Sequence, residues 1–151
     1  MKKLFYVFML ALIALSVVAL AACDNNSGET FAEGDELTLV IGYDEPQEIA
    51  IDLNGISREV TLPELFTAAK IEYEMVEGML TKVDRLAPEP PEYIYLYTSV
   101  ESDFDTSEYA KTMTFGDTEL CSSGVGANDM SIVPGEIIYI GTITSPIDFF
   151  K

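Results

Sequence analysis

The sequence predicts an α+β domain built on a mixed or antiparallel sheet, with one short helix packed on one face. Two observations indicate this class. Several short runs rich in β-branched and aromatic residues are separated by glycine, proline or acidic turns, as the strands of a sheet are. By contrast, one stretch alone, from Leu62 to Lys70 or Ile71, carries its apolar residues at helical spacing. We therefore expect strands to outnumber helices.

The chain begins with the pattern of a secretory signal. Lys2 and Lys3 precede an apolar stretch from Leu4 to Leu20, and the small pair Ala21-Ala22 follows, where a signal peptidase needs room. Residues 1–22 are therefore expected to be a signal peptide.

The end of that signal carries a short motif. Leu20-Ala21-Ala22-Cys23 resembles the lipobox of bacterial lipoproteins. The resemblance implies cleavage before Cys23 and a diacylglycerol on its thiol, which would make the membrane a partner through this lipid anchor. We then expect the protein on the extracytoplasmic face of the cell membrane. The alternative is an uncleaved spanning helix, because Leu4 to Ala22 is long enough to cross a hydrocarbon core of about 30 Å.

The stretch after Cys23 has the composition of a linker. Residues 24–35 are polar and acidic, and Phe31 is their only bulky apolar side chain. Such a composition is typical of a flexible tether. We therefore expect residues 23–35 to form a lipidated cysteine with an acidic tether, and residues 36–151 to form a single domain.

The charge and the missing residue types exclude several functions. All 26 acidic residues but only six of the eight basic ones follow Cys23, so binding of nucleic acid is not expected. The chain has no histidine, which excludes Ser-His-Asp and Cys-His catalysis and the commonest zinc sites. No cofactor and no enzymatic activity are expected. If Cys23 carries lipid, Cys121 has no intramolecular disulfide partner and is either buried or a free thiol.

The first half of the domain reads as two strands, a tight turn and a helix. Leu37–Ile41 and Ile49–Leu53 predict the two strands. Asn54-Gly55 predicts a tight hairpin leading into a third strand, Ile56–Val60. Thr61 with Glu64 three residues later has the form of a capping box, and Pro63 suits the first turn of the helix.

The second half alternates strands with turns. The pattern of Glu72–Glu77 is ambiguous and predicts neither a helix nor a strand. Ala87–Pro91 is rich in proline and is expected to break regular structure. In Tyr93–Val100, Ile94 and Leu96 share one face and the tyrosines share the other. Glu101–Ser107 is expected to be a solvated acidic loop. The remaining predicted strands are Met79–Val83, Thr112–Phe115 paired with Thr118–Cys121, and Ile137–Ile140.

The order of hairpin, helix and returning strands is that of a β-grasp domain. Thr61–Tyr73 with Gly78–Val83 resembles the helix-and-strand core of the carboxy-terminal domain of transcobalamin and its bacterial surface relatives. Tyr93–Val100 looks like the aromatic strand of that family, and Gly124–Ala127 with Val133–Ile138 is similar to its closing part. The resemblance implies a β-grasp-like fold and, as one ligand class, a corrinoid-like compound.

Two sets of residues are candidate sites. Tyr93, Tyr95, Tyr97 and Tyr139 could line one sheet face and present aromatic rings to a small molecule or to a protein of the cell envelope; the alternative is that they only cover the sheet.

Asp103, Asp105 and Glu108 place oxygen atoms in one acidic loop, as a weak calcium site requires. The loop lacks the glycine and the final carboxylate of an EF-hand, and the alternative is a solvated loop.

These observations favour a membrane-tethered, extracytoplasmic domain that binds a small molecule or acts as an adaptor, without catalysis. The alternative is a structural or protein-interaction lipoprotein of the cell envelope with no small-molecule ligand, which would recognise its partner by pairing at a sheet edge. An enzyme that uses the Cys121 thiol is the third hypothesis.

Overall fold

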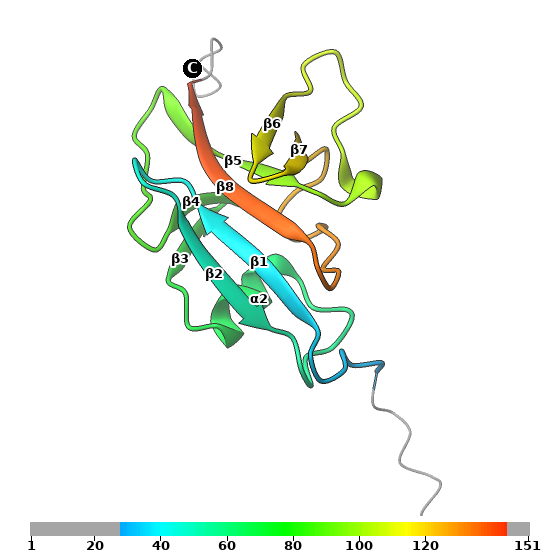
Figure 1. The fold of residues 1–151 in the computed structure, drawn as a ribbon. Helices are drawn as coiled ribbons and strands as arrows, with labels where there is room; N and C mark the ends of the chain where they lie inside the picture. The colour runs from blue at the N-terminus through cyan, green and yellow to red at the C-terminus, as the bar shows by residue number, and fades with distance from the viewer. Residues whose placement is uncertain (1–27, 145–151) are drawn as a thin grey trace, which may run out of the picture.

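The computed structural model describes residues 28–144, in which strands outnumber helices as the sequence predicts (Figure 1). The predicted signal peptide and Cys23 lie outside the described residues, as do residues 145–151. The elements are β1 (Glu36–Ile41), β2 (Gln47–Asp52), α2 (Leu62–Ala68), β3 (Tyr73–Val76), β4 (Met79–Val83), β5 (Glu92–Thr98), the 3₁₀ turn η1 (Glu101–Asp103), β6 (Thr112–Phe115), β7 (Thr118–Ser122) and β8 (Ile137–Thr144).

The main sheet is mixed. It has six strands in the order β2-β1-β8-β5-β7-β6. β1 and β8, the second and third strands in this order, are parallel, and the other neighbours are antiparallel. β3 and β4 form a separate two-stranded sheet. The α+β class and the mixed sheet are therefore confirmed.

One face of the main sheet carries the hydrophobic core. Figure 1 shows α2 behind β1 and β2, and its Leu62, Leu65 and Phe66 side chains are fully buried. Burying one such side chain contributes about 1.5–3 kcal/mol. The core also takes Leu37, Leu39, Ile41, Val83, Met130, Ile138 and Ile140, which come from β1, β4, β8 and the loop before β8.

The helix begins as predicted and ends earlier. The Glu64 N–H donates to the Thr61 hydroxyl oxygen, and the Glu64 carboxylate accepts from the Thr61 N–H at 2.9 Å, so the capping box is confirmed. Lys70 has φ 59°, and the Ile71 N–H donates to the Phe66 carbonyl at 2.8 Å. This left-handed closure satisfies the last carbonyls and stops the helix at Ala68, before Ile71.

The predicted tether extends too far along the sequence. Phe31 is only 3% exposed and belongs to the core, and the Arg58 guanidinium lies 5.0 Å from the centre of its ring. The Phe31 N–H donates to the Ile56 carbonyl at 2.9 Å. The folded part therefore begins before Glu36, because the Phe31 ring and its backbone hydrogen bond hold this acidic segment against the core.

The predicted third strand is also wrong, for a related reason. A turn forms at Asn54-Gly55, with the Ile56 N–H donating to the Leu53 carbonyl at 2.9 Å, but the following residues do not return along β2. Their backbone instead meets the segment before β1, with Asn54 bridged to Phe31 and Ser57 bridged to Thr30. Ile56–Val60 therefore forms no strand.

No helix of residues 28–144 combines the length and the apolar character needed to cross a bilayer.

Candidate functional site

An apolar groove of about 330 Å³ lies beside the first half of β5. Its walls come from four segments: Gly78 with the start of β4 (Met79–Thr81), the proline-rich loop (Pro88 and Pro90), β5 (Glu92–Leu96) and, more distant in the sequence, the loop after β7 (Ser123 and Val125–Ala127). A groove of this volume is in the range of sites that bind small ligands.

The β3–β4 hairpin leaves apolar side chains at the surface near this groove. Glu77 and Gly78 both have positive φ, 51° and 84°, which is the geometry of a tight two-residue hairpin turn. The turn is flanked by the cross-strand pair Val76 and Met79, whose side chains are 57% and 52% exposed. Of these two residues, Met79 lines the groove. Exposed apolar side chains at the mouth of an apolar groove are typical of a binding surface.

The charge around the groove is negative. Glu92 is the one charged residue among those that line the groove in the described part of the chain. The exposed residues Glu77 and Glu89 neighbour the lining residues Gly78 and Pro88 in the sequence, whereas Lys82, which follows the lining residue Thr81, is paired with Glu72 and Glu74. A ligand that carries positive charge therefore fits this groove better than an anion.

The edge of β5 that faces the groove is open. β8 pairs with β5 from Glu92 to Thr98, whereas β7 pairs with the other edge of β5 only at Tyr97 and Thr98. Within residues 28–144 no strand covers that edge from Glu92 to Leu96. All five residues of this stretch line the groove. Since their side chains alternate between the two faces of the sheet, the groove must run along the backbone edge.

The predicted tyrosine face exists, but it is not a flat platform. The Tyr95 and Tyr97 rings lie 5.3 Å apart, the Tyr97 and Tyr139 rings 6.2 Å apart, and the Phe115 and Tyr139 rings 5.8 Å apart, all tilted or edge to face. Phe115 belongs to β6, an edge strand that β5 and β7 separate from β8. The sheet therefore curls, and in Figure 1 the β6–β7 hairpin (yellow) crosses in front of β5.

This curl makes a second, smaller cluster opposite the main core. Leu120 and Val40 are fully buried but lie outside the main core. Leu120 shares the tyrosine face because Ser122, two residues along β7, pairs with Tyr97, and Val40 shares it because it pairs with Tyr139. Burial and the neighbouring tyrosines raise the pKa of Tyr97 above its usual value. The half-buried rings thus already pack against one another.

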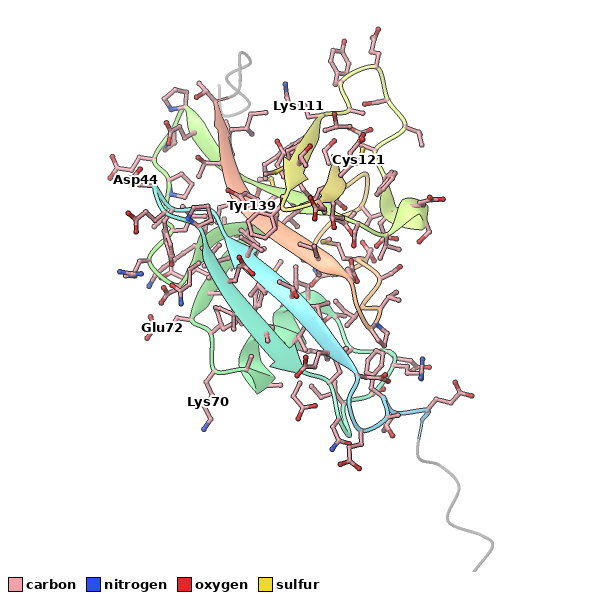
Figure 2. The ribbon with its side chains drawn as sticks, viewed as in Figure 1. Asp44, Lys70, Glu72, Lys111, Cys121 and Tyr139 are labelled. Atoms are coloured by element: carbon pink, nitrogen blue, oxygen red, sulfur yellow. The ribbon has the colours of Figure 1, made fainter. Side chains whose placement is uncertain are left out.

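Tyr139 also covers two glycines. A Cβ atom at Gly42 would lie 2.6 Å from the Tyr139 hydroxyl oxygen, and one at Gly141 would lie 3.0 Å from a ring carbon of Tyr139. Figure 2 shows the Tyr139 side chain in front of β8 and β1. Of the four predicted tyrosines, Tyr95, Tyr97 and Tyr139 come together, whereas Tyr93 lies at the groove with Tyr95.

The predicted calcium loop is not assembled. Asp103 is only 5% exposed, and its carboxylate accepts hydrogen bonds from the Ser131 N–H at 2.6 Å and the Ser131 hydroxyl at 2.9 Å. Asp105 accepts from the Ser107 N–H at 2.8 Å, which lowers the pKa of this carboxyl group, and Glu108 is exposed. Asp103 points inward instead of joining the other two. Among the described residues, no three acidic or cysteine side chains are gathered to hold a metal ion.

Glu136 is a second buried carboxyl group, and no sequence pattern pointed to it. Glu136 is 3% exposed; its Oε1 accepts from the Thr98 hydroxyl at 2.7 Å and its Oε2 from the Val133 N–H at 3.0 Å. Burial raises its pKa to about 7, and nearby Asp103 acts in the same direction. Both carboxylates bind the loop between β7 and β8, which also supplies Val125–Ala127 to the groove. In a sequence with many acidic residues, nothing distinguishes Asp103 and Glu136 from the exposed carboxylates.

The Cys121 side chain is buried, as the first of the two alternatives predicts. It is 8% exposed, and it lies on β7 with its sulfur 4.0 Å from the Asp105 carbonyl oxygen (Figure 2). A thiol buried in this way packs as a small apolar group.

Comparisons with known proteins identify no family. No family model matches the chain, and no curated protein matches its sequence. Among solved structures, one match is a protein from Ruminococcus gnavus described as a "putative metal binding protein", with 10% sequence identity and a TM-score of 0.47 over 74% of this chain and 98% of that chain. Superposition at this level does not establish a shared fold, and the metal binding in that description belongs to that protein.

Proposed function

We propose that this protein is a lipid-anchored, extracytoplasmic binding domain that works without catalysis and holds its ligand in the groove beside β5. The observation that carries the proposal is the groove itself: about 330 Å³, mostly apolar walls, and exposed Met79 at its mouth. The tyrosine face is the weaker candidate, because its rings pack against one another and under the β6–β7 hairpin.

The proposed fold is β-grasp-like. In support, the β1–β2 hairpin precedes α2, and the last strand, β8, returns to the centre of the sheet parallel to β1. A corrinoid-like ligand, which the family resemblance implies, remains a prediction to be tested at the groove.

The proposed anchor rests on the sequence. The apolar stretch that ends in Leu20-Ala21-Ala22-Cys23 supports lipidation of Cys23. Mass spectrometry of the protein purified from its own membranes tests this: we expect a mature chain that begins at Cys23 and carries acyl chains. A wild-type protein that has the mass of the uncleaved chain without acyl groups would contradict the anchor.

Ligand binding in the groove is tested with a matched pair of variants. A neutral, environment-sensitive dye, Nile red, is titrated into residues 24–151. Met79→Glu places a charge on the groove wall, and we expect it to weaken dye binding by about tenfold, since an apolar ligand that covers this position would have to remove water from the carboxylate. Val76→Glu is the control, because Val76 is equally exposed opposite Met79 but does not line the groove. Equal dye affinity in both variants would place the ligand elsewhere.

A further inference from the structure

The groove has the geometry of a strand-binding site. The Ser123 N–H donates to the Leu96 carbonyl at 2.8 Å, so the backbone groups of Leu96 point away from β8. The Ser99 N–H donates to the Ile137 carbonyl at 3.1 Å, so the backbone of Ser99 points toward β8. In an antiparallel strand, the N–H and C=O of one residue point the same way, and the direction alternates along the chain.

This alternation assigns the backbone groups of β5 residue by residue. Tyr93, Tyr95 and Tyr97 share the direction of Ser99 and bond to β8. Ile94 shares the direction of Leu96, so its N–H and C=O point into the groove, where β7 has not yet begun to pair. An unpaired strand edge beside apolar walls is the arrangement by which an extended peptide adds to a sheet: backbone hydrogen bonds give affinity, and pockets for alternate side chains give specificity.

The acidic residues at the groove also indicate the charge of the partner segment. Glu92 lies in the groove at the start of this edge, and Glu77 and Glu89 are neighbours in sequence of its lining residues. No basic side chain lines the groove in the part of the chain that the structure describes. Because Glu92 is exposed, a lysine or arginine opposite it would add a modest, salt-sensitive attraction that favours basic segments over acidic ones.

We propose that an extended segment of a partner protein, with apolar residues at alternate positions and a basic residue facing Glu92, adds as a strand to the open edge of β5 at Ile94. This part of the edge lies between the Glu92 N–H, which donates to the Glu89 carbonyl, and the Leu96 carbonyl, which accepts from the Ser123 N–H. This inference rests on the proposed function, because it names the ligand class of the same groove. β7 continues the pairing from Tyr97, so the added strand occupies the part of the edge that β7 leaves uncovered.

The test uses the mature, lipid-anchored protein held in lipid nanodiscs. A library of random nine-residue peptides is selected against it, and the enriched peptides are synthesised with a single N-methyl group on each backbone nitrogen in turn. We expect enriched sequences that alternate apolar with polar residues and contain lysine or arginine. Methylation should weaken binding at every second position by about tenfold or more, because each affected N–H loses a partner on β5. On the protein, the Ile94 amide should gain protection from hydrogen exchange when peptide binds.

A charge-reversal pair supplies the matched control. Glu92→Lys should weaken binding of the basic peptides by about tenfold, whereas Glu48→Lys, on the exposed outer strand β2, should leave it unchanged. The thermal unfolding midpoint of each variant checks that it folds. Strand addition would be overturned by enriched peptides in which apolar and polar residues do not alternate. It would also be overturned if the loss of binding on N-methylation did not recur at every second position. If Nile red binding depends on Met79 while no peptide is enriched, the groove binds a small molecule, and only the further inference fails.

Discussion

Glu136 makes the stability of this protein depend on pH near neutrality. Its carboxyl group is buried at the start of β8 and bound by the Thr98 hydroxyl and the Val133 N–H. Burial raises its pKa from 4.5 to about 7, against the opposing effect of these two hydrogen bonds. The perturbation that tests this is Glu136→Gln, which keeps the size and the acceptor oxygen but removes the titration.

The sign of the effect follows from where the proton is held. In the unfolded chain the group loses its proton near pH 4.5, but in the folded protein it keeps the proton up to about pH 7. The folded state therefore binds more protons between these values, so the stabilisation by Glu136 is complete below pH 4.5 and is lost as the pH rises through 7. At about 1.4 kcal/mol per pKa unit, the whole loss is about 3 kcal/mol.

The assay is urea unfolding of residues 24–151 at several pH values between 4.5 and 8, monitored by circular dichroism. We expect the free energy of unfolding of the wild type to fall by about 3 kcal/mol more than that of Glu136→Gln over this range. Other acidic residues contribute equally to both proteins, so the difference isolates Glu136. Glu48→Gln is the control, because this exposed residue on β2 should leave the pH dependence unchanged. Parallel curves for the wild type and Glu136→Gln would refute the reasoning.

Three further predictions test the core and the sheet. Phe31→Ala should lower the free energy of unfolding by about 3–5 kcal/mol in urea titration, because the buried ring leaves a cavity. Glu33→Ala is the control and should change the free energy of unfolding little. Equally small effects of both substitutions would show that Phe31 belongs to the tether and not to the core. Gly42→Ala should cost about 1–3 kcal/mol in the same assay, because its Cβ would meet Tyr139, and most of this cost should vanish in a Tyr139→Leu background. A thiol reagent should label Cys121 slowly in the folded protein and rapidly in urea; fast labelling of the folded protein would contradict its burial.

Local patterns were sufficient for most elements. β-branched residues in Leu37–Ile41 and alternation in Tyr93–Val100 predicted β1 and β5, and the Thr61 and Glu64 pair predicted the helix start. These signals depend on neighbours a few residues apart, which the sequence displays directly. The helix end was less visible, because Lys70 takes the left-handed conformation that usually marks glycine.

Two errors share one cause, a contact between distant segments. Phe31 was assigned to the tether because its neighbours are polar, and Ile56–Val60 was assigned to a strand because Asn54-Gly55 predicts a hairpin. In the structure each segment takes the other as a partner, with the Phe31 N–H bonded to the Ile56 carbonyl. Neither segment shows this in its own composition. Tertiary pairing therefore overrode both local predictions at once.

The groove could not be predicted for the same reason. Its walls come from four segments between Gly78 and Ala127, and no spacing rule connects them. The buried carboxylates are similar, since the partners that make burial tolerable, Ser131 for Asp103 and Thr98 for Glu136, are far away in the sequence. The alternation of the tyrosines did predict their common face, but not the curl that covers it.

The surfaces of β5 explain why binding is expected at an edge and not on a face. Ile94 and Leu96 pack against the main core on one face, and Tyr95 and Tyr97 pack into the aromatic cluster on the other. β8 takes the whole of one edge, and β7 takes the end of the other. The Glu92 N–H is bonded to Glu89 and the Leu96 carbonyl to Ser123, so the part of β5 that these described neighbours leave uncovered is the edge at Ile94, which is lined by apolar walls. An uncovered edge carries unpaired hydrogen-bonding groups that favour strand addition, so a strand occupied on both faces can still bind a partner through its backbone.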